Sequence, residues 1–95
     1  MEKLYMNGRA FIPKKDILIC NVCETDPMKL AFAGTEIYER IYATTKGTFY
    51  KVRNTERRKE ARILSKEEAF SFLEENAAYI ITDNYDSVFG EPERG

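Results

Sequence analysis

The chain has 95 residues, of which 43% are hydrophobic and 33% are charged, and its formal net charge is −1. This length predicts a single domain over residues 1–95, and the lack of an apolar leader or of an apolar run of about 18 residues predicts a cytoplasmic protein without a membrane span. Histidine is absent, which removes the commonest general base near neutral pH and the commonest metal ligand and so argues against an enzyme.

The N-terminal segment predicts a β-hairpin followed by a third strand. In KLYMNGRAFI, residues 3–12, the Asn7-Gly8 pair suits a type I′ turn, whose twist matches a two-residue hairpin. Pro13 ends the second strand because it has no N–H for a ladder. The β-rich run DILICNV, residues 16–22, predicts the next strand.

A short helical turn and a second hairpin are expected next. Asp26 suits an N-cap, Pro27 suits the first helical position and Gly34 suits the position after the helix, so residues 27–33 predict a short helix. An extended segment is the alternative. Residues 36–44 and 48–53 predict two strands, followed by a polar loop and a short strand at residues 62–64.

The clearest helix begins after Ser65. Ser65 and Glu68 have the spacing of a capping box, and Ala69 and Leu73 lie on one apolar stripe. Residues 91–95 are expected to form a frayed tail. This order of elements predicts an α+β fold, with an antiparallel sheet of about four to six strands covered on one face by one C-terminal amphipathic helix.

The CNVC segment places Cys20 and Cys23 at the spacing of half a zinc site. A zinc site needs about four ligands, and the chain has no further cysteine and no histidine. We therefore interpret both cysteines as small buried hydrophobes and expect no metal and no cofactor. A zinc shared between two chains is the alternative.

The hairpin YERIYATTKGTFYKVR, residues 38–53, gives the first candidate surface. A four-residue loop at 44–47 would place Arg40 opposite Lys51, a like-charge pair that an anionic or acidic partner would relieve. One face would then be core, and the other would carry rings and cations suited to a protein or a nucleic acid. A solvated face or a homodimer contact is the alternative. The candidate partner-binding residues on this face are Tyr38, Arg40, Tyr42, Phe49, Lys51 and Arg53.

The uneven charge distribution gives the second set of candidates. Residues 46–62 contain seven cations, among them Arg57 and Arg58, against two acids, whereas residues 67–93 contain eight acids and no cation. Such asymmetry steers charged partners, although ordinary solvated surface is the alternative interpretation. The acidic candidates are Glu74, Glu75, Asp83 and Asp86.

Four segments also resemble a known group of proteins. The segments are similar to parts of small, mostly uncharacterised proteins of Firmicutes and their phages and plasmids. They are NGR at residues 7–9, IYATTKGTFYKV, ILSKEEAFSFLEEN and DNYDSVFGEPE. RNTERRKEAR stands here where that group often has a Gly- and Trp-rich insertion. Proteins of this kind are similar in style to anti-CRISPR inhibitors. The resemblance implies a non-enzymatic inhibitor that binds a host nuclease such as Cas9, and the alternative is a small nucleic-acid-binding or regulatory protein that uses residues 46–62.

Overall fold

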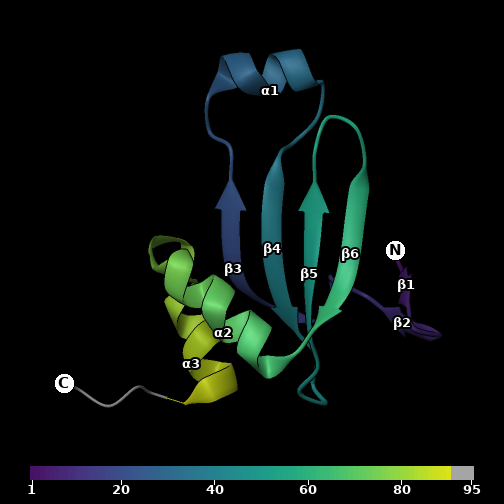
Figure 1. The fold of residues 1–95 in the computed structure, drawn as a ribbon, viewed down its shortest axis with the longest axis vertical. Helices are drawn as coiled ribbons and strands as arrows, with labels where there is room; N and C mark the ends of the chain where they lie inside the picture. The colour runs from purple at the N-terminus through teal and green to yellow at the C-terminus, as the bar shows by residue number, and fades with distance from the viewer. Residues whose placement is uncertain (91–95) are drawn as a thin grey trace.

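The computed structural model describes residues 1–90, so the expected tail at 91–95 lies outside the described residues. The predicted α+β fold is confirmed: a four-stranded antiparallel sheet and a two-stranded hairpin combine with helices (Figure 1). The sheet has the order β3 (Ile17–Cys23), β4 (Tyr38–Ala43), β5 (Phe49–Asn54) and β6 (Lys59–Leu64). The hairpin contains β1 (Leu4–Met6) and β2 (Arg9–Phe11), and the helical elements are α1 (Pro27–Ala33), α2 (Lys66–Glu75), η1 (Ala77–Tyr79) and α3 (Thr82–Phe89).

The sheet has a core on each face. On the face that we call the helix side, α2 and α3 pack on Ile41, Phe49 and Leu64. On the opposite face, the hairpin side, Met6 and Phe11 from β1 and β2 pack on tyrosines and Val52. This small domain therefore buries both faces of part of its sheet, which compensates for its limited length.

Local sequence signals fix the ends of these elements as predicted. Asn7 and Gly8 have φ angles of 50° and 73° in the β1–β2 turn, as a type I′ turn requires. Asp26 caps α1 through the Met28 N–H at 2.9 Å. Ser65 and Glu68 form the reciprocal capping box of α2, with bonds of 3.1 and 3.0 Å.

The hairpin register differs from the prediction by one residue. The loop spans residues 44–48 and not 44–47, and Gly47 lies within it with a φ of 85°. Consequently Tyr42 pairs with Tyr50, and Arg40 pairs with Val52 and not with Lys51. A one-residue shift moves a strand's side chains to the other face, so the expected single face of rings and cations does not exist.

Three further elements differ from expectation. β6 begins at Lys59 and not at residue 62, because the Thr55 N–H donates to the Arg58 carbonyl at 3.0 Å and closes a tight turn. η1 and α3 add helices that the sequence did not predict. Cys20 is buried as expected, but Cys23 is exposed at the end of β3, so the interpretation of both as buried is wrong for Cys23.

The first strand of the sheet has a protected edge. A bulge at Ile19 turns both Ile19 and Cys20 into the helix-side core. The Ile81 N–H then donates to the Ile19 carbonyl at 2.8 Å, and the Asn84 side chain donates to the Leu18 carbonyl at 2.8 Å. The segment from η1 to α3 thus covers backbone groups of β3 that would otherwise template further strand pairing.

Candidate partner-binding groove

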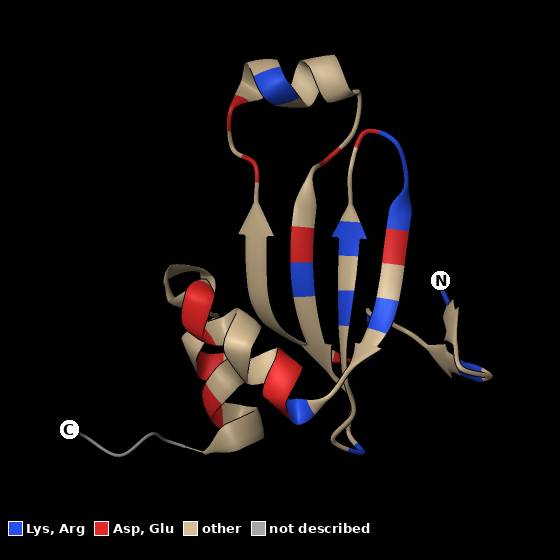
Figure 2. Ribbon diagram, viewed as in Figure 1, with Lys and Arg blue, Asp and Glu red and all other residues tan. Residues whose placement is uncertain are grey.

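The helices cover only half of the helix side of the sheet. In Figure 1, α2 and α3 lie over the half near the β4–β5 turn, while α1 stands beyond the other end of the strands. Between them, β4, β5 and β6 carry charged residues (Figure 2), and a hollow of about 520 Å³ lies over Lys51, Arg53, Glu60 and Arg62. We call this surface the open groove, with a floor formed by Glu39, Lys51, Arg53, Glu60 and Arg62.

The floor of the open groove alternates in charge along one cross-strand row, whereas the neighbouring row places Lys51 opposite Arg62. Across the strands, Arg53 lies between Glu39 and Glu60. Glu39 forms ion pairs with two cations, since its carboxylate lies 3.5 Å from Lys51 Nζ and 4.0 Å from Arg53 Nε. The Lys51 ammonium also lies 5.4 Å from the centre of the Phe72 ring on α2. The floor therefore has little net charge of its own to attract an ion.

One end of the open groove is apolar. A hollow of about 680 Å³ lies between α1, the ends of β3, β4 and β5, and Tyr79 of η1. Of the residues that line it, Phe32 is 86% exposed and Tyr79 is 48% exposed, and Met28, which is on the same helix as Phe32 but outside this lining, is 69% exposed. No residue of α1 is buried. Large exposed apolar side chains grouped in this way mark an interaction surface.

The other end of the open groove leads to an acidic helical layer. A hollow of about 360 Å³ between the floor and α2 is lined by Glu67, Glu68 and Glu75. Within residues 1–90, no cation pairs with Glu74, Glu75, Asp83 or Asp86. These four acids on α2 and α3 therefore give a field that no ion pair within residues 1–90 neutralises (Figure 2).

The cations of residues 46–62 are instead mostly paired. Arg58 contacts Glu60, and Arg62 Nη1 lies 2.8 Å from Glu68. With the Lys51, Arg53 and Lys59 pairs, five of the seven cations in this stretch have acidic partners. The Ser65 backbone N–H and the Arg62 guanidinium hold the pKa of Glu68 down to about 2, so this pair persists across the physiological range.

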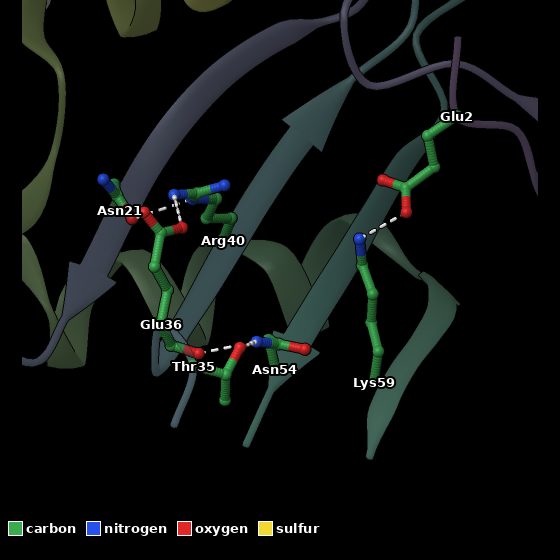
Figure 3. Close-up of polar contacts among 7 residues, drawn as sticks. All are labelled: Glu2, Asn21, Thr35, Glu36, Arg40, Asn54 and Lys59. Carbon is green, nitrogen blue, oxygen red and sulfur yellow. Dashed lines mark hydrogen bonds and ion pairs between the residues drawn. The ribbon is translucent and has the colours of Figure 1, made fainter. Parts of the chain in front are cut away.

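Polar contacts on the hairpin side tie loops to the sheet (Figure 3). Arg40 donates from Nε to the Asn21 side chain at 3.1 Å and stacks 3.7 Å from the centre of the Tyr38 ring. Asn54 donates to the Glu36 carbonyl at 2.6 Å, which anchors the segment between α1 and β4. Arg40 is therefore held by this chain itself.

The structure separates the candidates of the central hairpin. Tyr38, Arg40 and Tyr42 face the hairpin side, whereas Phe49, Lys51 and Arg53 face the helix side. The side chains of Tyr38, Tyr42 and Phe49 are buried and pack in the two cores. Of this set, only Lys51 and Arg53 lie on the floor of the open groove. Arg57 and Arg58 lie in the β5–β6 turn.

Sequence reasoning missed the apolar end of the groove. Met28 and Phe32 lie one helical turn apart in PMKLAFA, and that spacing is the only sequence signal that marks them. The same spacing is typical of a helix that packs on a core, so only the structure distinguishes the two cases.

Burial raises the pKa of the Cys20 thiol to about 11, so this group is a neutral thiol in the core. Within residues 1–90, no three of the cysteine, aspartate and glutamate side chains gather as a metal site would require. No helix among the described residues has the length and apolar character needed to cross a membrane.

The chain matches no family model, no curated protein and no solved structure.

Proposed function

We propose that this protein is a non-enzymatic interaction module of the cytoplasm that binds a protein partner at the open groove. The exposed apolar cluster at α1 carries the proposal. Phe32 and Tyr79 line a hollow large enough to take a side chain of a partner, and the exposed Met28 belongs to the same helix as Phe32. An apolar anchor with a polar rim is the usual anatomy of a protein interface.

The negative charge near the open groove indicates that the partner's surface is positively charged. Glu75 lines the hollow between the floor and α2, and together with the other unpaired acids of α2 and α3 it favours a partner with a basic surface, through complementary contacts and faster encounter. A Cas9-type nuclease presents such a surface where it holds nucleic acid. Together with the resemblance to small proteins of Firmicutes, phages and plasmids, this supports a mobile-element inhibitor of the anti-CRISPR type.

The nucleic-acid alternative for residues 46–62 has less support. Five of the seven cations in that stretch already contact carboxylates of the same chain. A phosphate would have to displace those carboxylates, which lowers the gain from each contact. A homodimer through the apolar cluster is the third candidate, and sedimentation of the purified protein distinguishes it.

The test measures binding to a purified Cas9-type nuclease and inhibition of its DNA cleavage. Replacing Phe32 and Tyr79 together with alanine should weaken binding by about tenfold or more, since buried aromatic anchors dominate interface energies. Replacing Lys3 with alanine, an exposed residue on the N-terminal arm, should leave binding unchanged.

Charge reversal provides the second arm of this test. Replacing all four unpaired acids with lysine should abolish binding to the nuclease and leave the circular dichroism spectrum unchanged. These acids are Glu74, Glu75, Asp83 and Asp86. If the wild type neither binds nor inhibits the nuclease, the proposed nuclease is wrong. If it binds and both groups of variants bind equally well, the open groove is not the site.

A further inference from the structure

The two edges of the four-stranded sheet differ in what meets their backbone groups. At the β3 edge, Ile81 and Asn84 donate to carbonyls of the strand. At the other edge, β6 pairs with no strand of residues 1–90 except β5, and the β1–β2 hairpin forms a separate sheet (Figure 1). Glu2 of the N-terminal arm contacts the Lys59 side chain and leaves the backbone of β6 free. We call the backbone of β6 on this side the open edge.

The turn before β6 shows which residues direct backbone groups toward the open edge. The Thr55 N–H donates to the Arg58 carbonyl at 3.0 Å. Hydrogen-bonded and non-hydrogen-bonded pairs alternate along an antiparallel ladder, so the next pair, Asn54 with Lys59, is of the second kind. The residues of β6 that bond to β5 are therefore Glu60, Arg62 and Leu64. Those whose N–H and C=O groups point away from β5 are Lys59, Ala61 and Ile63.

The outward groups are available to another strand. Among the described residues, no backbone hydrogen bond reaches the outward N–H and C=O groups of β6. A row of such groups is a template for pairing with a further strand. The open edge therefore lacks the cover that the segment from η1 to α3 gives to β3.

The charges on β6 select a partner strand and a register. Two copies of β6 that pair in antiparallel orientation bond outward groups to outward groups only if their twofold axis passes through a residue. An axis at Glu60 or at Arg62 would place like charges opposite each other, which is unfavourable. An axis at Ala61 places Glu60 of each copy opposite Arg62 of the other. The strand is therefore self-complementary in one register.

Both charged side chains keep an atom for this contact. Glu60 contacts Arg58 through Oε1, and Arg62 contacts Glu68 through Nη1. Within residues 1–90, Oε2 of Glu60 and Nη2 of Arg62 form no ion pair. Both side chains are exposed. They would form non-hydrogen-bonded pairs across the two strands, in which side chains approach most closely.

We propose that two copies of this chain pair through the open edge about a twofold axis at Ala61, which joins their four-stranded sheets into one continuous sheet. Self-complementary charge favours a second copy over another extended segment, because a twofold contact uses the same residues on both sides. The axis is perpendicular to the sheet, so both helix sides face the same way and the two open grooves adjoin. The pairing does not depend on the proposed binding of a nuclease.

Disulfide formation in the full chain tests the register. The background is Cys23→Ser, which removes the exposed native cysteine. Hydrogen-bonded residues of an antiparallel pair have Cα atoms about 5.5 Å apart, a distance that a disulfide spans. Ala61→Cys lies on the axis and should give a covalent dimer on mild oxidation. Lys59→Cys is the matched control, because it faces Ile63 of the other copy and should remain monomeric.

Sedimentation of charge variants tests the complementarity. Glu60→Arg and Arg62→Glu should each weaken self-association by about tenfold or more, because every dimer then contains two like-charge pairs. An equimolar mixture of the two variants should dimerise as the wild type does, because opposite charges face each other again. Phe32→Ala combined with Tyr79→Ala should leave the dimer unchanged, since neither residue lies on β6.

Four results would overturn the proposal. The first is a wild type that sediments as a monomer at every concentration. The second is Ala61→Cys that gives no more covalent dimer than Lys59→Cys, and the third is a mixture of the charge variants that stays monomeric. The fourth is a dimer that is lost on replacing Phe32 and Tyr79, because this dimer would form through the apolar cluster and not through β6.

Discussion

The helices α1 and α2 begin in the same way but differ in what they bury. Asp26 caps α1 and Ser65 caps α2, each through a side-chain oxygen that accepts a backbone N–H. α2 buries Ala69 and Leu73 against the sheet, whereas α1 buries no residue at all. Capping therefore decides where each helix starts, and packing decides whether its apolar side chains stabilise the fold or stay available to a partner.

The largest expected difference between the two helices is in stability. Leu73→Ala removes a side chain that is 2% exposed in the helix-side core and should lower the free energy of unfolding by about 2–5 kcal/mol. Phe32→Ala changes an exposed side chain and should stay within about 0.5 kcal/mol of wild type. Urea denaturation of both variants measures this. Equal destabilisation would mean that α1 packs on the fold in solution.

Removing the cap of α2 should have the next largest effect. Ser65→Ala deletes the bond to the Glu68 N–H and should lower the free energy of unfolding by about 0.5–2 kcal/mol. Ser87→Ala, whose hydroxyl donates within α3, provides a control at an exposed serine outside any cap. An unchanged urea midpoint for Ser65→Ala would show that the capping box adds nothing to the packing of α2.

The elements that the sequence predicted are those with signals contained in a few neighbouring residues. Asn7-Gly8 defines the first turn, Asp26, Pro27 and Gly34 bound α1, and the spacing of Ser65 and Glu68 defines the start of α2. The residue before α3, Ile81, offers no side-chain cap, so this helix has no comparable signal. Its position follows from contacts of Tyr85 and Phe89 with the core, which are tertiary.

The candidate site was less predictable because it depends on register and on distant contacts. One additional loop residue before Phe49 moved Lys51 away from Arg40 and placed it beside Glu39, so the predicted repulsion became an ion pair. Lys51 and Arg53 remained at the surface that we propose as the site. Phe32 and Tyr79 come together only through the fold, and no local pattern brings them to one hollow.

A smaller expected effect is the pH dependence of stability that arises from Glu68 in the first turn of α2. The pKa of Glu68 is lowered from 4.5 to about 2 by the Ser65 backbone N–H and by Arg62. A carboxyl with a depressed folded-state pKa stabilises the fold above its unfolded pKa and loses that contribution as the pH falls through its folded pKa. Stability should therefore fall between about pH 4.5 and pH 2, and Glu68→Gln should flatten this part of the curve. An identical acid limb in the variant would contradict this.

The smallest expected effect is at the cap of α1, and it tests the comparison most directly. Asp26→Ala removes the bond to the Met28 N–H, a change that costs about 1 kcal/mol where the capped helix contributes to global stability. Because α1 buries no residue, the destabilisation should stay local, since segments with few packed contacts open independently of the core. Urea denaturation should show no change, while hydrogen exchange of the amides of Leu30 and Gly34, which bond to Asp26 and Leu30 carbonyls, should accelerate about fivefold, the factor that corresponds to about 1 kcal/mol. A lower urea midpoint would show that α1 is coupled to the sheet. Unchanged exchange would show that Gly34, and not Asp26, holds the helix in place.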